Sequence, residues 1–431
     1  MAGAKKPKKL DKKRPIIVVG GGPAGMTAAQ AAIKYYNNVI LFDKNPEAGK
    51  KLQSILSDCA FVSEELPYDK IARAFGDHED FVKPALKAFG WKQLSSHLAS
   101  MGIKLTSNGT SHLIISPGTS GEVAQRLKQA AETAGVIIRK SSKVSDILFS
   151  GDVATGVVVN SVEYSASSVI IACGSAASPA RGATINGYEF ARKAGHSINR
   201  IRPALVGLET EEKYGKLLDG AEFRDCRMEV TKDEQLIFSD RGGIQFTSYG
   251  VGGDLILTHS ARIIELLGDN KSTRHAVRIH VDMIPNIKKK ELETWVAQEI
   301  SSSPKITVGE LFEKNIPEKL RNVMSRVTRI HSEKPIANLS SLERKMLLLW
   351  VKDFHLTIKR PRPFNETMGV LGGVPPAEVD SGTMRSLKKN NLYFAGDVMD
   401  LPGPWGGYNL QLAFSTGNLA GMSAAKSLVE S

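Results

Sequence analysis

The residues with the clearest chemical signature are three glycines near the N-terminus, Gly20, Gly22 and Gly25, spaced as G-x-G-x-x-G. In this spacing the first glycine permits a tight turn, the second lets a pyrophosphate approach the backbone, and the third lets a helix pack closely on a strand. The β-branched run Ile16 to Val19 precedes them and an alanine-rich helical stretch follows. The pattern predicts a strand, a turn and a helix that bind a dinucleotide diphosphate.

A carboxylate stands where an adenosine ribose would require one. A second strand is expected over Val39 to Phe42, and Asp43 ends it. Its distance from Gly25 is close to the spacing of about 20 residues at which an acidic residue accepts hydrogen bonds from the ribose. The alternative is a tight turn with a solvated aspartate, but the strand and helix around the glycines favour a dinucleotide site.

The C-terminal region repeats the order of strand, loop and helix. Leu392 to Ala395 form the expected strand, Gly396 and Asp397 end it, and the glycine loop Gly403 to Gly407 leads into a helix. Such a loop leaves room for an isoalloxazine ring, and the helix N-terminus would direct its N–H groups at the pyrimidine edge. Positive potential there stabilises reduced flavin, so the two termini together predict FAD. A flexible surface loop is the alternative.

Bulk composition narrows the class of protein. At 431 residues the chain exceeds one ordinary core, and no apolar run approaches the roughly 20 residues of a membrane span. Of the net charge of +12, +6 lies in residues 1–14, which hold seven Lys or Arg and one Asp and have no apolar signal segment. We therefore expect a cytoplasmic protein with a disordered basic tail. Cys59, Cys173 and Cys226 are widely spaced, which argues against a dithiol relay and a zinc site.

The predicted fold class is α/β, a Rossmann-like FAD-binding domain of the glutathione-reductase type split by an inserted domain. The expected divisions are a tail over 1–14, the first part of the FAD domain over 15–201, an insert over 202–365, and the return of the FAD domain over 366–431. Within the insert, a β-rich unit carries a helical unit over about 285–355. No second glycine fingerprint occurs there, so a separate NAD(P)H-binding Rossmann domain is not expected.

Hydrophobic periodicity predicts the individual elements. In the FAD domain, helices are expected over 80–101 and 120–134, and strands over 136–139, 143–149, 151–164 and 168–174. In the insert, strands are expected over 205–208, 227–230, 236–238, 244–247 and 255–258, and helices over 288–300, 308–312, 317–327 and 342–354.

Several motifs together resemble one family. They are GGGPAGMTAA, GYEFARKAGHSI, PALVGLE, FTSYGVGGD, GVPPAEVD and LYFAGDVMDLPGPWGGYNLQLAFSTGNLAG. This combination is similar to the BaiN-type flavoproteins, also described as aminoacetone oxidase-like proteins, and it covers about four fifths of the chain in the same order. The resemblance implies non-covalent FAD in a two-lobed domain, NAD(P)H as electron donor, and reduction of a carbon–carbon double bond conjugated to a ketone in steroid-like molecules.

The resemblance also implies roles for particular residues. It assigns the pyrophosphate to Gly20, Gly22, Ala24 and Gly25, the ribose to Asp43, the adenine to Val144, and the ribityl chain and ring to Asp397, Gly407, Asn409 and Leu410. Lys44, Ala172, Gly174 and Gly396 complete the expected cofactor-binding set.

Two stretches depart from the family pattern. Where the family has a glycine-rich S-G-G-G-R-C-N loop after G-[KR]-K-L, this chain reads GKKLQSILSDCAFV. The basic pair Lys50 and Lys51 in that stretch is compatible with either phosphate contact or simple solvation. Where the family has F-T-H-Y-G-I-S-G-P, Ser248 replaces a histidine and Asp254 replaces a proline.

The leading functional hypothesis is NAD(P)H-driven reduction of an enone in a hydrophobic small molecule. Tyr249, Tyr408 and Arg241 are the candidate catalytic residues, because the reaction needs a proton source and a donor to the carbonyl oxygen. An FAD-dependent amine or alcohol oxidase that uses oxygen is the alternative. A flavin-binding, RNA-associated protein is a further one, although nucleic acid is an unlikely partner since no aromatic-rich basic motif accompanies the tail.

Overall fold

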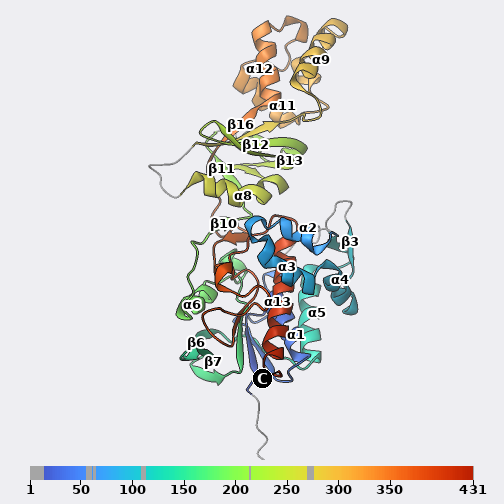
Figure 1. Cartoon of the computed structure of the whole chain (residues 1–431). Helices are drawn as coiled ribbons and strands as arrows, with labels where there is room; N and C mark the ends of the chain where they lie inside the picture. Colours follow the sequence, from blue (N-terminus) through green and yellow to red (C-terminus); the bar gives the residue numbers. More distant parts are fainter. Residues whose placement is uncertain are drawn as a thin grey trace, which may run out of the picture. The chain divides into compact units, whose positions relative to one another are not determined.

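The chain forms two compact units (Figure 1). The computed structural model describes residues 14–54, 61, 65–107, 113–212, 215–268 and 276–430. The first unit combines Met1–Arg202 with Val370–Ser431, and the second is Pro203–Gly369. The sequence places the insert over 202–365, and the predicted tail lies outside the described residues except for Arg14.

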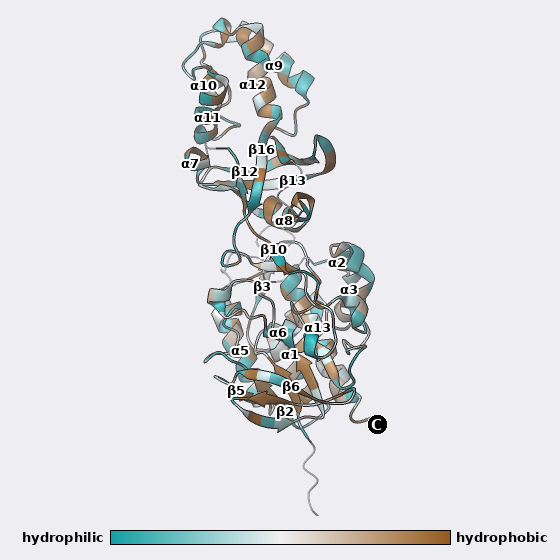
Figure 2. Ribbon diagram, turned by 90° about the vertical axis from the view of Figure 1, so that its left-hand side faces the viewer, coloured by the Kyte–Doolittle hydropathy of each residue, from teal (hydrophilic) through white to brown (hydrophobic). Residues whose placement is uncertain are grey.

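A five-stranded parallel sheet forms the centre of the first unit, in the order β18-β9-β1-β2-β5. Every residue of β1 and β9 is buried, as expected for parallel strands covered on both faces. The apolar strands are largely brown in Figure 2. The strands are β1 Ile16–Val19, β2 Val39–Phe42, β5 Ile137–Arg139, β9 Ser168–Ile171 and β18 Leu392–Phe394.

Helices cover one face of this sheet, and a three-stranded antiparallel sheet covers the other (Figure 1). The phenol ring of Tyr164 packs edge-on against Phe42 of the central sheet, with 5.1 Å between ring centroids. The helices are α1 Pro23–Ile33, α2 Tyr68–Arg73, α3 Glu79–Ala88, α4 Trp91–Ser100, α5 Ser120–Thr133, α6 Asn186–Lys193 and α13 Tyr408–Lys426. The antiparallel strands are β6 Val144–Ser150, β7 Val153–Val159 and β8 Val162–Ser165, and a separate pair is formed by β3 Leu105–Ser107 and β4 Leu113–Ile115.

Helices α1 and α13 lie side by side because glycine lets their backbones touch. A Cβ at Gly417 would overlap the carbonyl oxygen of Ala24, and one at Gly421 would overlap that of Ala28. Only glycine fits at these two positions of α13. The N-terminal and C-terminal segments of the chain are therefore joined into one domain by direct backbone packing.

The second unit contains a closed antiparallel barrel with the strand order β11-β14-β13-β12-β15-β16. Alternate residues of β12, namely Cys226, Met228 and Val230, are fully buried, as the period of a strand requires. Asp233 and Glu234 both adopt positive φ in the tight turn between β12 and β13. The barrel strands are β11 Leu208–Thr210, β12 Glu222–Lys232, β13 Gln235–Thr247, β14 Gly250–Gly252, β15 Val277–Asp282 and β16 Phe354–Pro361.

Helices complete the second unit. Ser340 and Glu343 form a capping box at the start of α12, and Thr307 and Glu310 form one at α10. The helices are α7 Gly215–Leu218, α8 Asp254–Leu267, α9 Lys289–Ser302, α10 Val308–Leu311, α11 Glu318–Thr328 and α12 Ser341–Lys352. The chain enters this unit through β10 Arg202–Ala204 and leaves it through β17 Gly369–Leu371.

The predicted α/β class with an inserted β-rich and helical domain is confirmed, but three predictions in the insert differ from the structure. The stretch 205–208, expected as a strand, connects β10 to β11, and only Leu208 lies in a strand, because Leu205 adopts a positive φ of +49° that a strand does not allow. The stretch 255–258, expected as a strand, lies in α8, because a short apolar run does not distinguish a strand from a buried helix. The stretches 236–238 and 244–247, expected as two strands, belong to the single strand β13, whose polar middle hid its continuity. Asp254 begins α8, where a carboxylate suits the positive end of the helix dipole.

Among the residues that the structure describes, no helix is both long and apolar enough to cross a membrane.

The glycine contacts of α13 predict a position-specific effect on stability. We expect Gly421→Ala to lower the free energy of unfolding by about 1–3 kcal/mol, because the new methyl group overlaps the α1 backbone. Gly121→Ala in α5 is the matched control, since its Cβ would meet only Thr119 Oγ1 at 3.6 Å. That change should be neutral or slightly stabilising. Denaturant unfolding of both variants checks this, and equal effects would contradict the packing argument.

Candidate functional site

The glycine loop after β1 has the geometry of a diphosphate cradle. Gly20 has φ +110°, and a Cβ there would overlap the carbonyl oxygen of Ala172 on the neighbouring strand segment. A Cβ at Gly25 would overlap the carbonyl oxygen of Gly20. At Gly22, in contrast, a Cβ would meet no atom within 4 Å, so this residue faces open space at the start of α1. Two glycines thus close the turn, and the third leaves room for a ligand.

The end of β18 joins this cradle from the other end of the chain. A Cβ at Gly396 would lie 2.9 Å from the Cβ of Ala24, and Gly396 has φ +72°. Its N–H donates to Thr416 Oγ1 at 3.0 Å, which fixes it against α13. Gly174, with φ +72°, also faces open space after β9. The structure therefore brings together six predicted residues in one place, namely Gly20, Gly22, Ala24, Gly25, Ala172 and Gly396.

Asp43 lies buried beside the cradle, with 6% of its surface exposed. Its Oδ2 accepts a hydrogen bond from Gly21 N–H at 2.8 Å, and its Oδ1 accepts from the backbone and side-chain nitrogens of Asn45 at 2.7 and 2.9 Å. Burial raises the pKa of Asp43, and the hydrogen bonds from Asn45 and Gly21 oppose that shift without cancelling it. The carboxylate is thus held in place at the end of β2.

Two further predicted residues adjoin Asp43. Val144 is the first residue of β6 and is buried, and it follows closely on Ser142, whose N–H donates to the carbonyl oxygen of Asp43 at 2.8 Å. Lys44 extends its ammonium group to the carbonyl oxygen of Ala183 at 3.1 Å. Burial lowers the pKa of Lys44, and attraction to Asp43 works against that shift.

Asp397 has a cationic neighbour that the predicted site residues do not include. Lys51 Nζ lies 3.6 Å from Asp397 Oδ2 and is itself buried from solvent. The only signal in the sequence was the basic pair after Gly49, which is equally compatible with solvation. Gly21 and Asn45, which hold Asp43, were also missed, although an asparagine two residues after an aspartate often closes a turn.

The start of α13 carries Gly407, Tyr408, Asn409 and Leu410. Gly407, with φ +86°, is the N-cap, and the N–H of Gln411 makes the first intrahelical bond to its carbonyl oxygen at 2.9 Å. Tyr408 is 8% exposed and packs edge-on against Phe75, with 6.3 Å between ring centroids. Leu410 packs against the core.

Arg241 and Tyr249 belong to the second unit, where each has a separate set of partners. Arg241 Nε and Nη2 donate to Asp225 at 2.6 Å each, and Nη2 also donates to Asn286 at 2.6 Å. Asp225 and Asn286 line a polar cleft of about 450 Å³. The guanidinium of Arg362 lies over the Tyr249 ring, 4.3 Å from its centroid. The contacts of Arg241 and those of Tyr249 thus involve different residues.

The thiol of Cys173 is not among the proposed cofactor contacts described above. Burial raises the pKa of the Cys173 thiol to about 12, and this partly buried side chain packs against the core of the first unit. Within the described part of the chain, no group of three or more His, Cys, Asp or Glu residues has the arrangement of a metal site. In the stretch GKKLQSILSDCAFV, which departs from the family's glycine-rich loop, residues 55–60 and 62 lie outside the described residues.

Solved structures show the same fold. FrdA of the Escherichia coli quinol fumarate reductase is 14% identical, with 97% of this chain and 70% of that chain covered and a TM-score of 0.52. A 3-ketosteroid delta1-dehydrogenase from Sterolibacterium denitrificans is 12% identical, with 96% and 99% covered and a TM-score of 0.51. The two proteins share the architecture of this chain.

Two relatives match almost the full chain. A 3-dehydro-bile acid delta(4,6)-reductase from Clostridium scindens is 27% identical over 414 residues, which cover 95% of this chain and 98% of the relative. A ribosomal RNA dihydrouridine synthase from Haemophilus influenzae is 26% identical over 416 residues, with 95% and 98% covered.

The buried carboxylate predicts opposite effects on stability and cofactor affinity. Because the pKa of Asp43 is raised in the folded state, the ionised carboxylate destabilises the fold at neutral pH, whereas the protonated form below the unfolded pKa does not. We expect Asp43→Asn to melt at the same or a higher temperature than the wild type at pH 7 without FAD. This advantage should disappear below about pH 3.9. FAD affinity should fall, because the ribose loses a charged acceptor. Calorimetry measures the melting temperature, and flavin titration measures the FAD affinity. A lower melting temperature of Asp43→Asn at pH 7 would contradict the predicted effect on stability.

The family model described as "HI0933-like protein Rossmann domain" matches residues 14–423. The geometry fits a dinucleotide, since Gly22 faces open space and a hydrogen bond from Gly21 holds the Asp43 carboxylate at the end of β2. The expected resemblance to BaiN-type flavoproteins is thereby confirmed. The chain belongs to the HI0933-like family and is an FAD-dependent oxidoreductase of that family.

Proposed function

We propose that this enzyme reduces a carbon–carbon double bond conjugated to a carbonyl group, with NAD(P)H as the electron donor. The main support comes from two relatives that act on different classes of substrate and are each matched over 98% of their length. The name of each describes the reduction of a carbon–carbon double bond. A steroid enone contains C=C–C=O, and uracil contains the same unit in its C6=C5–C4=O segment. A shared reaction on this unit is simpler than two unrelated activities on one fold.

The reaction balances without a further co-reactant. The β-carbon of the substrate gains a hydride, the α-carbon gains a proton, the C=C π bond is lost, and NAD(P)H is oxidised to NAD(P)⁺. Bound FAD supplies a ring that accepts and donates hydride. The protein must hold that ring, exclude water, polarise the carbonyl and deliver the proton.

Residues of the first unit fit the binding part of this task. The cradle of Gly20, Gly22 and Gly25 receives the diphosphate, and Asp43 accepts from the adenosine ribose. Asp397, with Lys51 beside it, takes the ribityl chain or a phosphate, where the ammonium group offsets negative charge. The N–H groups at the start of α13 lie at the positive end of the helix dipole and suit the pyrimidine edge.

The three catalytic candidates differ in their surroundings. Arg241 is the weakest candidate, because its Nε and Nη2 groups already donate to Asp225 and Asn286. Tyr249 is held under Arg362, and Tyr408 is packed against Phe75 at the start of α13. We propose Tyr408 as the first proton donor to test and Tyr249 as the second.

The main candidate substrate is a steroid-like or other hydrophobic enone, and a uridine in ribosomal RNA is the second candidate. The second is supported by the Haemophilus influenzae relative and by an Escherichia coli ribosomal RNA dihydrouridine synthase, 22% identical over 401 residues. Because of these two relatives, we place a nucleic-acid substrate ahead of the amine or alcohol oxidase, which preceded it in the sequence analysis.

An anaerobic assay tests the proposal. We expect purified protein to be yellow, NADPH or NADH to bleach its flavin, and a 3-keto-4-ene steroid to restore the oxidised spectrum while gaining two hydrogens by mass spectrometry. Ribosomal RNA lacking dihydrouridine is the parallel substrate, and protein stripped of FAD is the control. Flavin that is bleached only by an amine or alcohol, with peroxide release in air, would instead support an oxidase.

The proton donor is tested by hydroxyl deletion. We expect Tyr408→Phe to retain its FAD and to lower kcat by about 100-fold, the usual scale for loss of a general acid. Tyr35→Phe is the control, because Tyr35 is 47% exposed at the end of α1. Tyr249→Phe is assayed in parallel. An unchanged kcat in Tyr408→Phe, with a loss in Tyr249→Phe, would transfer the role to Tyr249.

A further inference from the structure

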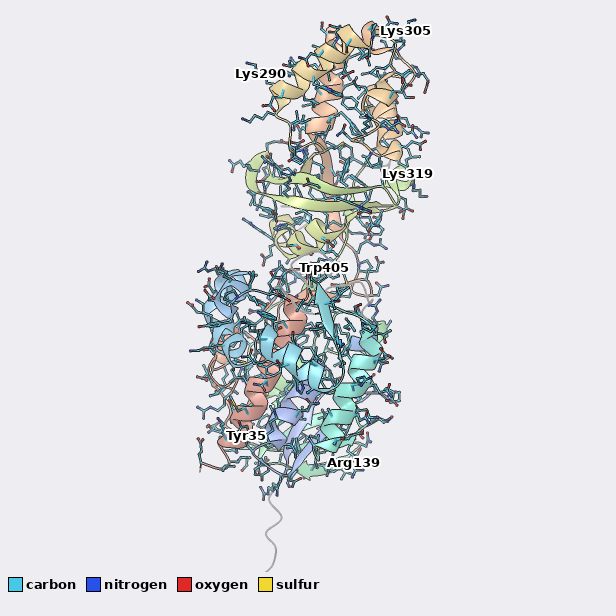
Figure 3. All side chains as sticks on the ribbon, turned by 90° about the vertical axis from the view of Figure 1, so that its right-hand side faces the viewer. Tyr35, Arg139, Lys290, Lys305, Lys319 and Trp405 are labelled. Atoms are coloured by element: carbon cyan, nitrogen blue, oxygen red, sulfur yellow. The ribbon has the colours of Figure 1, made fainter. Side chains whose placement is uncertain are left out.

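The segment between β18 and α13 contains a glycine loop, Gly403–Gly407, whose shape is fixed within the first unit. Gly406 and Gly407 have φ +110° and +86°, so the backbone turns sharply just before α13. Trp405 lies in this loop and is labelled in Figure 3. The resemblance to BaiN-type proteins places the neighbouring Asn409 around the flavin, without saying which of its atoms would act there.

The side chain of Asn409 is already engaged with this loop. Its Oδ1 accepts from Gly403 N–H at 2.8 Å, and its Nδ2 donates to the carbonyl oxygens of Gly403 at 2.9 Å and Pro404 at 3.4 Å. The carboxamide therefore pairs with both polar groups of Gly403, much as a neighbouring peptide group would. Both donor hydrogens and the acceptor have partners within the loop.

An aromatic pair holds the same glycine by packing. A Cβ at Gly403 would lie 2.7 Å from Phe75 Cε1 and 3.2 Å from the Cβ of Tyr408. Phe75 is 4% exposed and packs edge-on against Tyr408. Gly403 is thus fixed by polar contacts with Asn409 and by apolar contacts with two rings.

This arrangement determines which groups at the start of α13 are available to a ligand. Gln411 makes the first intrahelical bond, so the N–H groups of Asn409 and Leu410 precede it, and the N-cap Gly407 has no side chain to cap them. The Asn409 side chain is committed to the loop, whereas its backbone N–H lies among these first-turn amides.

We propose that Asn409 is a positioning residue that clamps the loop 403–407, so that the backbone amides of α13, and not the Asn409 carboxamide, face the flavin. This inference rests on FAD binding at the site but not on the identity of the substrate. A clamp set before the cofactor arrives reduces the conformational freedom lost on binding. Its removal therefore alters the loop in the absence of FAD.

The test uses full-length protein, stripped of FAD and then reconstituted. Trp405 is the reporter, and subtracting the emission of the matching Trp405→Phe protein isolates it from the other three of the four tryptophans. We expect Asn409→Ala to change Trp405 emission and iodide quenching without FAD, and to raise the FAD dissociation constant at least about tenfold. The flavin midpoint potential should fall as the amides lose their fixed position. Asn37→Ala, at an exposed site between α1 and β2, is the control and should change none of these three measurements.

Asn409→Asp provides the second variant if Asn409→Ala does not fold. It retains an acceptor for Gly403 N–H but loses both donated bonds and places a negative charge near two carbonyl oxygens. We expect the same direction of change in all three measurements. Weaker FAD binding with unchanged Trp405 emission in the stripped protein would mean that the carboxamide contacts flavin directly, and would overturn the proposal. Unchanged FAD affinity in either variant would also overturn it. Neither readout involves an enone, so failure of the proposed reaction would be seen separately.

Discussion

The contact on which the rest of the structure depends is the backbone packing of α1 against α13. Gly417 and Gly421 bring the last long helix onto the carbonyl groups of Ala24 and Ala28. As a result, the end of β18 reaches the N-terminal glycine loop, and Gly396 lies beside Ala24. A cofactor site can therefore be built from two segments that the whole inserted unit separates in sequence. A bulkier residue at either glycine would push α13 away from α1, and the two halves of the site would move apart with them.

Polar groups in this site are held in place at some expense to stability. Asp43 is buried, and its pKa is raised despite three hydrogen bonds. Keeping this carboxylate ionised therefore costs folding free energy, which is consistent with a role in binding a ligand. Asp397 has Lys51 at 3.6 Å, a distance that is long for a direct hydrogen bond. Gly22 and Gly174 leave open space beside these groups. Binding sites commonly show this combination of fixed polar groups and unfilled volume.

The family relationship and the geometry both suggest that the two units of the chain have different roles. The first unit contains the glycine loop and the buried carboxylate that we propose for FAD, and this part of the proposed site is independent of the identity of the substrate. The second unit is a closed barrel with its own helical cluster and its own polar networks around Arg241 and Arg362. Differences in substrate between relatives are most simply placed in parts of the protein outside the cradle.

The sequence by itself determined the elements whose signals are local. The turn at Gly20 and Gly25, the strand before it and the carboxylate after β2 were predicted because steric limits and hydrophobic periodicity act over a few residues. The helices α9, α10, α11 and α12 were predicted for the same reason. The short apolar run in α8 was misassigned, because four residues do not define a period.

Only the tertiary structure decided which distant groups meet. The contacts of Lys51 with Asp397, of Gly21 with Asp43 and of Phe75 with Gly403 depend on the packing of separate elements, which no local pattern records. Asn409 illustrates the difference most clearly. Its motif marked it for the flavin region, whereas its three hydrogen bonds to the loop became visible only once the chain was folded. Residue type limits the bonds that a side chain can make, and the fold selects its partners.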